Sequence, residues 1–153
     1  MANSSEPLAV ALFSEIFAAD QLARNRLSKA LPKGMELSHF SVLNYLARAN
    51  GERSPAQLAQ SFHLTRGAMT NTLTKLQWSG HIHIRPDWDD ARRKMVSISP
   101  AGRDARDAAI AAIAPIINDV VTEIGVERVR QALPVLRALR ERLGSIPSDI
   151  SSD

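Results

Sequence analysis

The stretch that decides the fold of this chain runs from Leu64 to Ser99 and reads LTRGAMTNTLTKLQWSGHIHIRPDWDDARRKMVSIS. Thr65 is a good helix N-cap, because its hydroxyl can accept a hydrogen bond from an unpaired amide of the next turn. Apolar side chains then recur at the spacing of one helical face, at Met69, Leu73 and Leu76. Gly80 is expected to end this helix, since glycine takes the left-handed conformation at little cost.

A β-hairpin is expected directly after this helix. Its strands, Ile82 to Arg85 and Met95 to Ser99, alternate apolar and polar residues, as strands with one buried face do. Between them lies a long hairpin tip, Pro86 to Lys94, which ends in the three cations Arg92, Arg93 and Lys94.

The side of the helix opposite its apolar face carries no acidic residue. Its residues are small, polar or basic: Gly67, Thr70, Asn71, Thr74 and Lys75. Such a helix fits the major groove of duplex DNA, and a basic hairpin beside it can reach along the backbone. The pattern therefore predicts a helix that reads DNA. The alternative is an amphipathic helix beside a solvated loop.

Composition is that of one soluble globular domain. The chain has 153 residues, of which 44% are hydrophobic and 23% charged. No apolar run approaches the ~20 residues of a membrane span, so we expect a cytoplasmic protein without a membrane partner. The absence of cysteine excludes disulfides and thiolate zinc clusters. His81 and His83 would share a strand face but lack a third ligand, so no metal or other cofactor is expected.

Positive charge is concentrated around the predicted DNA-reading segment. The net charge is +3, and residues 54–103 contain seven Lys or Arg against three Asp or Glu. The remaining residues hold twelve against thirteen. This distribution is the expected electrostatic footprint for phosphate. Because the excess is small, tight binding would need two copies or strong local focusing of charge.

Helices are expected on both sides of this segment. A polar start, Met1 to Glu6, is expected to be disordered, and a long helix follows from Pro7 to near Leu31. Ser38 is expected to cap a second helix that ends at Ala49 to Gly51. Ser54 to Gln57, SPAQ, is a capping-box signal for a short third helix. A turn of two residues joins it to Thr65, which predicts a helix-turn-helix.

Two further helices are expected after the hairpin. Ser99 and Pro100 start an alanine-rich helix through Ile124, which Pro115 should kink. In the last helix Pro134 should cause a bend or a fresh start, and a loose tail follows from Ser145. These terminal helices carry more apolar surface than one small winged helix can cover, so we expect a homodimer with a helical interface.

Several short motifs carry a resemblance to a known family. They are Leu58-Ala59, Leu64-Thr65-Arg66, Thr70, Leu73, Leu76, Gly80, Asp90-Ala-Arg92, Val96-Ser-Ile98-Ser99 and Gly102. Together they resemble the multiple antibiotic resistance regulator (MarR) family of winged-helix regulators. The expected fold is mainly α, an α+β winged helix-turn-helix with long dimerisation helices. Within a single chain 1–153, residues 36–99 would form the DNA-binding region, and residues 7–31 and 100–144 the dimerisation helices.

The resemblance also implies a function. It implies a homodimer built from the first, fifth and sixth helices that binds a pseudo-palindromic operator in double-stranded DNA, usually as a repressor. It further implies release by a small effector, often a phenolic or aromatic acid. The alternative is a winged-helix module for protein interaction without DNA binding, for which the acids Asp87, Asp89 and Asp90 are the best evidence. No enzyme is expected, because neither a glycine-rich phosphate loop nor a catalytic triad is present.

Expected contacts with DNA follow from position and chemistry. Thr65 and Arg66 would meet phosphate, while Gly67, Thr70, Asn71, Thr74 and Lys75 would meet base edges or flanking phosphate. Many relatives have Arg at the position of Asn71, which puts their operator preference in doubt here, because Asn pairs best with adenine. Arg92 matches the family's wing arginine, and Asp90 would orient it.

For several other side chains, the sequence allows two interpretations of their role. Arg93 and Lys94 either contact phosphate or are solvated cations of a hairpin tip. Ser38 and Ser54 are mainly caps, with phosphate contact as the alternative. Trp78 is interpreted as a core residue, although it could stack on Trp88 beside the wing.

The effector site is expected where the dimerisation helices meet the winged helix. Its candidate lining residues are aromatic walls and one group that can pair with a carboxylate: Phe13, Phe17, His39 and Tyr45. For Phe13 and Phe17 ordinary core packing is the favoured interpretation, and His39 is alternatively an exposed side chain beside a cap.

Overall fold

A computed structural model describes residues 5–49 and 51–145 of the chain. In order, these residues form α1 (Glu6–Ala30), α2 (Leu37–Arg48), α3 (Pro55–Ser61), α4 (Arg66–Trp78), β1 (Ile82–Pro86), β2 (Lys94–Ile98), α5 (Pro100–Ile124) and α6 (Val126–Ser145). This order confirms the expected winged helix-turn-helix fold with long terminal helices.

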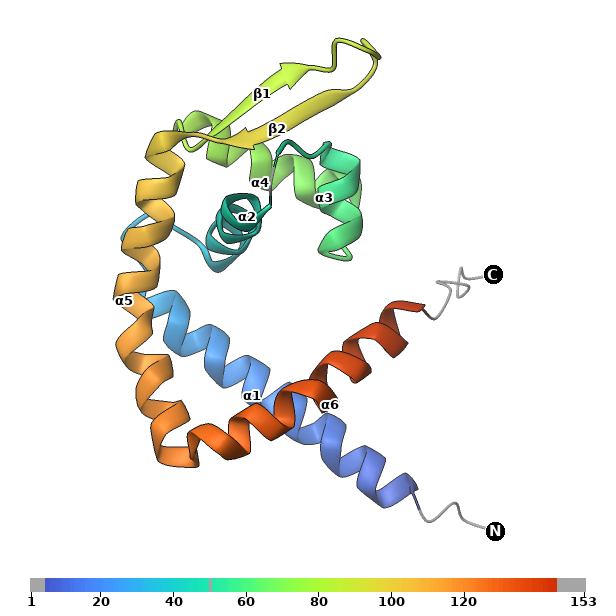
Figure 1. Ribbon diagram of the computed structural model, residues 1–153, viewed down its shortest axis with the longest axis vertical. Coiled ribbons are helices and arrows are strands. Elements are labelled where there is room, and N and C mark those ends of the chain that lie inside the picture. Colours follow the sequence, from blue (N-terminus) through green and yellow to red (C-terminus); the bar gives the residue numbers. More distant parts are fainter. Residues whose placement is uncertain (1–4, 50, 146–153) are drawn as a thin grey trace.

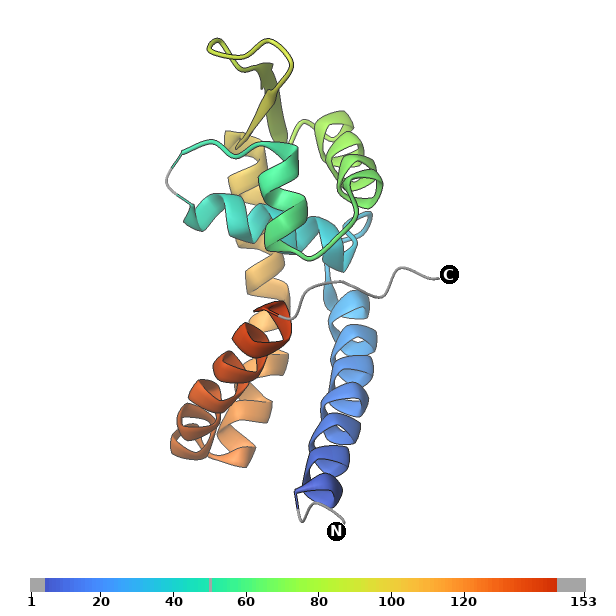
Figure 2. The same cartoon turned by 90° about the vertical axis from the view of Figure 1, so that its right-hand side faces the viewer.

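The elements divide into a head and three long helices. Figure 1 shows α2, α3, α4 and the hairpin gathered at one end of the molecule, with α5 running from the hairpin to the opposite end. In Figure 2, α1 and α5 lie to one side of the head, and α6 runs back from the far end of α5 toward the head. The head contains the segment predicted to read DNA, and the long helices contain the segments predicted to dimerise.

One apolar core holds the head together. Its buried side chains come from α2, α3, α4 and both strands: Val42, Leu43, Leu46, Leu58, Ala59, Met69, Leu73, Leu76, Ile82 and Val96. Burial of the larger of these side chains contributes roughly 1.5–3 kcal/mol each relative to full exposure. The wing and the helix-turn-helix therefore belong to one packed body.

Outside the head, burial within the single chain is sparse. A smaller cluster of Leu31, Ala109 and Ile113 joins the end of α1 to α5. Neither α1 nor α6 contains a buried residue. Phe17 is 68% exposed and Phe13 half-buried, so the prediction that they pack in the core is wrong for the single chain. The physical reason is that the apolar surface of α1 extends beyond its contacts with α5 and α2.

The predicted helix starts are confirmed at three positions. Thr65 Oγ1 accepts from the Ala68 amide at 3.1 Å. Ser54 Oγ accepts from the Gln57 amide at 3.2 Å, and Gln57 Oε1 accepts from the Ser54 amide at 2.9 Å. Ser99 Oγ accepts from the Gly102 amide at 3.0 Å and donates to the Gly80 carbonyl at 2.6 Å. At the predicted helix end, Gly80 has φ 74, just beyond Trp78.

The predicted start at Ser38 is wrong. Helix α2 begins at Leu37, and Glu36 is its N-cap. The Glu36 amide donates to Nδ1 of His39 at 3.2 Å, so His39 takes the place that Glu or Gln holds in the usual capping box. Because histidine is not the usual residue there, the sequence pattern predicts a cap two residues late.

The prolines do not divide the long helices. Helix α5 is uninterrupted through Pro115, and α6 does not begin afresh at Pro134. The chain instead turns at Gly125, where φ is 111 and α5 and α6 meet at 101°. Left-handed backbone angles are easy only for glycine. No kink is needed at Pro115 to redirect the chain.

Most of the predicted loose segments lie outside the described residues, namely residues 1–4, 50 and 146–153. Of the residues at their edges, Glu6 already begins α1 and Ser145 ends α6.

The wing and α5 meet at Gly102, where the fold leaves no room for a side chain. A Cβ at this position would overlap the His81 carbonyl oxygen. Gly102→Ala should therefore destabilise the protein by about 3 kcal/mol, because backbone must move to accept the methyl group. Urea unfolding followed by circular dichroism measures this change.

Gly67→Ala is the matched control. Gly67 lies in α4 with nothing within 4 Å of a Cβ, so alanine should be neutral or stabilise by up to about 1 kcal/mol. Equal stabilities for the two variants would contradict the close approach at Gly102.

Candidate nucleic-acid interface

Helix α4 presents its polar face to solvent. Met69, Leu73 and Leu76 are buried in the head. The residues predicted to contact DNA are all exposed: Thr65, Arg66, Gly67, Thr70, Asn71, Thr74 and Lys75. Burial of one face of a helix fixes which face remains outside, so the phase predicted for α4 is confirmed.

The turn between α3 and α4 sets the angle of this exposed face. His63 takes left-handed backbone angles with φ 52, and the Leu64 amide donates to the Ala59 carbonyl at 2.9 Å. These features change the direction of the chain within a short turn, as a helix-turn-helix requires.

A hollow of about 530 Å³ lies between the wing and the helix-turn-helix. Its lining comes from the start of α3, from α4 and from the wing: Ser54, Pro55, Ala56, Arg66, Thr70, Arg92, Arg93 and Lys94. Four of these residues are cationic and none is acidic. The structure thus brings Arg66 and Thr70 together with the three wing cations, and it adds Ser54. The other predicted residues of α4 are exposed but do not line the hollow, nor does Ser38.

The wing is longer by one pair than the sequence indicated. Residues pair from Ile82 with Ile98 to Pro86 with Lys94. A third segment joins its edge, because the Arg53 amide donates to the Val96 carbonyl at 3.0 Å and the Val96 amide donates to the Arg53 carbonyl at 2.7 Å. This bridge ties β2 to the loop that leads into α3.

Asp90 organises the wing tip. Its Oδ1 accepts from the Arg92 amide at 3.1 Å and from Arg92 Nε at 3.2 Å. The hydrogen bond from the Arg92 side chain, followed by that from its amide, lowers the pKa of Asp90. The contact agrees with the expectation that Asp90 orients Arg92. The Arg92 side chain is 91% exposed, so it remains open to a phosphate.

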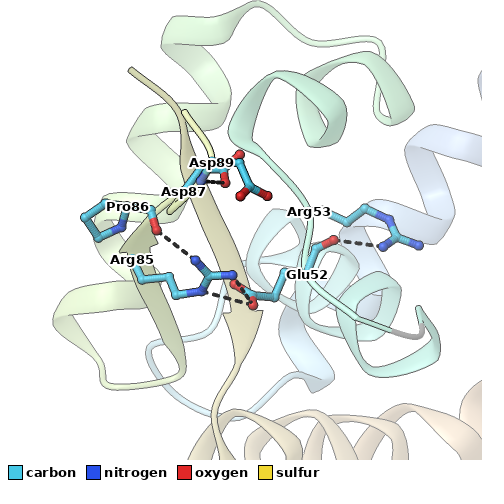
Figure 3. Close-up of polar contacts among 6 residues, drawn as sticks. All are labelled: Glu52, Arg53, Arg85, Pro86, Asp87 and Asp89. Atoms are coloured by element: carbon cyan, nitrogen blue, oxygen red, sulfur yellow. Dashed lines mark hydrogen bonds and ion pairs between the residues drawn. The ribbon is translucent and has the colours of Figure 1, made fainter. Parts of the chain in front are cut away.

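Arg85 is held by groups that sequence reasoning missed. Its Nε and Nη2 donate to Glu52 Oε1 at 3.0 and 2.8 Å, as Figure 3 shows. The ring of Trp88 lies 4.0 Å from its Cζ. Glu52 is 33 positions from Arg85 along the chain, and no local sequence pattern signals such a pair.

The predictions for the two tryptophans need correction. Trp78 is 87% exposed, so the expected core position is wrong. Trp88 is 84% exposed and lies over Arg85.

The four predicted effector residues do not share one pocket. Phe13 and Phe17 lie along α1, with ring centroids 6.1 Å apart. Tyr45 packs edge-on against Phe62 and lines a different hollow, beside Arg48 and Arg53. A hydrogen bond with Ser61, and a further one from Arg53, lower the pKa of Tyr45. His39 lies at a third place.

His39 lines a pocket of about 290 Å³ between the head and the long helices. The side chain is buried, so the prediction that it is exposed is wrong. Its Nδ1 accepts the Glu36 amide, whereas its buried Nε2 has no hydrogen-bond partner among the described residues and lies 3.8 Å from a Glu36 carboxylate oxygen. Burial, more than any neighbouring charge, lowers the pKa of His39 below 6.5. Because Nδ1 accepts a hydrogen bond, the proton of the neutral ring lies on Nε2.

Two other kinds of functional feature are a metal site and a membrane span. Within residues 5–49 and 51–145, no group of three or more His, Asp or Glu side chains is placed to hold a metal ion. No single helix in these ranges is long and apolar enough to cross a membrane, and α5 with α6 meets that test only as a pair bent by 101°.

Comparison with known proteins finds a family model that matches part of this chain. Residues 33–93 match the model of the MarR family. The transcriptional activatory protein BadR of Rhodopseudomonas palustris is 26% identical over 106 residues, which are 67% of this chain and 60% of that protein. The chain thus spans less than two thirds of the length of this relative.

Solved structures show the same fold over nearly the whole chain. The transcriptional regulator BldR from Sulfolobus solfataricus superposes with a TM-score of 0.79 at 26% identity, covering 93% of this chain and 99% of that one. Sco3205, a MarR family regulator from Streptomyces coelicolor in complex with DNA, gives 0.79 at 18% identity, covering 98% and 97%. A mutant of MarR from E. coli complexed with operator DNA gives 0.76 at 18% identity, covering 90% and 99%.

The head, its paired strands and the order of the helices define a winged helix-turn-helix protein. Residues 33–93 match the MarR family model, and the chain as a whole has the fold of the solved transcriptional regulator BldR.

Among the cations that line the hollow, Arg92 is predicted to govern the salt dependence of DNA binding. Arg92→Ala should lower the slope of log affinity against log salt by about 0.9 for each phosphate that Arg92 would otherwise neutralise. The fall in affinity should be largest on duplexes with A·T-rich flanks, whose narrow minor groove attracts arginine. Folding should be unchanged, because the side chain is exposed. A salt series by fluorescence anisotropy, on a duplex selected by the protein from a random pool, measures the slope.

Arg130→Ala is the control, since Arg130 is also exposed and paired with an acid, Glu127, but lies on α6. Superimposable slopes for the wild type and both variants would mean that the wing is a solvated loop.

Proposed function

We propose that the chain is a DNA-binding transcriptional regulator that reads a pseudo-palindromic operator as a homodimer. Helix α4 would enter the major groove, and the wing would follow the adjacent backbone and minor groove. The observation that carries this proposal is the acid-free hollow in which Arg66 and Thr70 meet Arg92, Arg93 and Lys94. Two of the solved proteins with the same fold are in complex with DNA.

The wing acids favour DNA over a protein partner once their contacts are considered. Asp90 is bound to Arg92, and Asp87 Oδ1 accepts the Asp89 amide at 3.0 Å. None of the three acids lines the hollow. They shape the tip, and the protein-interaction alternative loses its best evidence. A salt titration separates the two, since binding to duplex DNA must weaken steeply as salt rises.

The long helices support assembly as a homodimer. Large apolar side chains on α1, the second half of α5 and α6 are exposed in the single chain, among them Leu8, Leu22, Val120, Ile124, Leu133 and Leu136. Exposed apolar surface of this extent is typical of protein interfaces. A two-fold dimer would place two copies of α4 about one helical turn of DNA apart, ~34–36 Å.

An effector site fits the pocket beside His39. A neutral histidine with its proton on Nε2 donates one hydrogen bond, and the family resemblance suggests a small aromatic or phenolic acid as the acceptor. Lys33 and His81 also line this pocket. Because the pocket is bounded by α4, α5 and the loop after α1, an occupant would contact both the head and the long helices.

Repression is the direction of regulation that we propose, although the relative BadR is named an activatory protein. A reporter gene behind the selected operator tests the direction: deletion of the regulator should raise expression, and a fall would establish activation instead.

The dimer proposal predicts a sharp difference between two faces of α6. Leu136→Glu with Leu139→Glu should give unfolded or aggregated protein, because charges would be buried in an apolar interface. The control, Gln131→Glu with Ala138→Glu, places two glutamates on the opposite, exposed face of the helix. Light scattering after size exclusion measures the mass. A folded monomeric Leu136/Leu139 variant that bound DNA well would contradict the dimer proposal.

Base readout predicts a specific role for Asn71. Asn71→Ala should cost roughly 1–3 kcal/mol on the preferred operator and flatten the base preference at one symmetric pair of positions. Gln77→Ala removes another exposed amide from α4 and should leave the preference unchanged. Binding to a library of single-base operator variants measures both. An equal loss on every sequence would make Asn71 a backbone contact.

The effector proposal is tested by thermal stabilisation. Salicylate or benzoate at 100 times its dissociation constant should stabilise the wild type by about 2.7 kcal/mol. His39→Glu preserves the capping-box pattern but repels a carboxylate, so the stabilisation should disappear. Tyr45→Phe, at a different hollow, should keep it. Stabilisation of the His39 variant equal to the wild type would place the effector elsewhere.

A further inference from the structure

We propose that Glu52, Arg85 and Trp88 are positioning residues for DNA binding, which fix the tip of the wing relative to the start of α3. We call these three residues the wing clamp. The inference rests on the proposed DNA binding and assigns to these residues a role in it that involves no contact with DNA.

The guanidinium of Arg85 is occupied on its edge and on its face. Nε and Nη2 donate to one carboxylate oxygen of Glu52, and Nη1 donates to the Pro86 carbonyl at 2.8 Å (Figure 3). The Trp88 ring covers the guanidinium at 4.0 Å. Glu52 and Arg85 are 31% and 33% exposed, so solvent competes less with this pair than with the Arg92–Asp90 pair. Arg85 is therefore committed to internal contacts and is not available to bind phosphate.

The wing clamp joins three segments that a two-stranded hairpin alone would leave loosely connected. Glu52 precedes Arg53, whose backbone pairs with Val96, and Ser54, which caps α3 and lines the hollow. Arg85 lies on β1, and Trp88 lies in the tip. Two-stranded hairpins are marginally stable by themselves. The clamp thus fixes the tip relative to the start of α3.

The position of Trp88 is transmitted to the wing cations through the tip. The Asp87 amide donates to the Arg93 carbonyl at 2.9 Å, and the Arg93 amide donates to the Asp90 carbonyl at 2.9 Å. Asp90 in turn holds Arg92. The indole is 84% exposed and buries little apolar surface, and its ring lies against Arg85.

A competing explanation gives the opposite sign. If Glu52 only neutralises Arg85, removal of the carboxylate would free a cation for phosphate. Affinity would then rise, and its salt dependence would become steeper. If the clamp positions the wing, removal of the carboxylate lowers affinity and makes the salt dependence shallower.

The experiment is a double-mutant comparison on the full-length protein. Glu52→Gln and Trp88→Ala are each made with and without Arg92→Ala, and binding to the selected duplex is followed by fluorescence anisotropy from ~50 to ~200 mM salt. When made alone, Arg92→Ala removes one phosphate contact per subunit. The fall in affinity between ~50 and ~200 mM salt is then about tenfold smaller than that of the wild type. In each clamp variant that fall is already reduced, and adding Arg92→Ala changes it by less than about twofold.

Two further variants separate positioning from stability. Trp88→Phe keeps an aromatic face over Arg85 and should restore the wild-type slope. Trp78→Ala removes a tryptophan of similar exposure, 87%, outside the wing, and should leave the slope unchanged. Thermal unfolding by circular dichroism should give the same midpoint for the wild type, Trp88→Ala and Trp78→Ala. If Glu52→Gln lowers the unfolding midpoint, the salt dependence of Trp88→Ala decides between loss of positioning and loss of stability.

The outcomes are distinguishable. Additive effects of Arg92→Ala in the clamp variants, or tighter binding by Glu52→Gln, overturn the positioning role while leaving the proposed function intact. A wild-type protein that selects no duplex overturns both.

Discussion

Burial of the apolar face of α4 is the constraint on which the rest of the head depends. Met69, Leu73 and Leu76 lie in the same core as Leu43, Leu58 and Val96. Because an α-helix has 3.6 residues per turn, this burial turns Thr70, Asn71 and Thr74 outward. Val96 is the central residue of β2, so the wing is anchored to the same packed body. Thr70 and the wing cations consequently border one hollow.

The long helices differ from the head, because most of their apolar surface is not buried within one chain. The apolar core of the head is closed within one chain, whereas α1 and α6 bury no residue. Both helices contact α5, and the bend at Gly125 directs α6 back along the molecule (Figure 1). A chain with one closed core and one open apolar surface is suited to assembly through the open surface, while the head keeps its polar face free. The proposed dimer interface and the proposed DNA-binding face therefore lie on separate surfaces.

Local chemistry could be predicted from the sequence, and contacts between distant segments could not. The caps at Ser54, Thr65 and Ser99, the phase of α4 and the hairpin all follow from patterns within a few residues. The core position predicted for Trp78 is wrong, because a residue two positions after Leu76 lies about 200° around the helix from it. The start of α2 was misplaced because His39 performs the task of a capping-box Glu. The Glu52–Arg85 pair and the division of the effector candidates among three places depend on tertiary packing, which periodicity does not encode.

The distribution of charge links the two surfaces. Of the seven cations between residues 54 and 103, Arg85 is paired with Glu52, Arg92 with Asp90 and Lys75 with Glu36. Within the described residues, the cations of the hollow that have no ion-pair partner are Arg66, Arg93 and Lys94. The salt dependence of DNA affinity scales with the number of phosphates that a protein neutralises, and a strong dependence corresponds to about 6–10 such contacts. One copy of the head offers too few. Dimerisation through the apolar surface of the long helices would double the number of cations that face DNA. The proposed dimer therefore accounts both for the small net charge of one chain and for its open apolar surface.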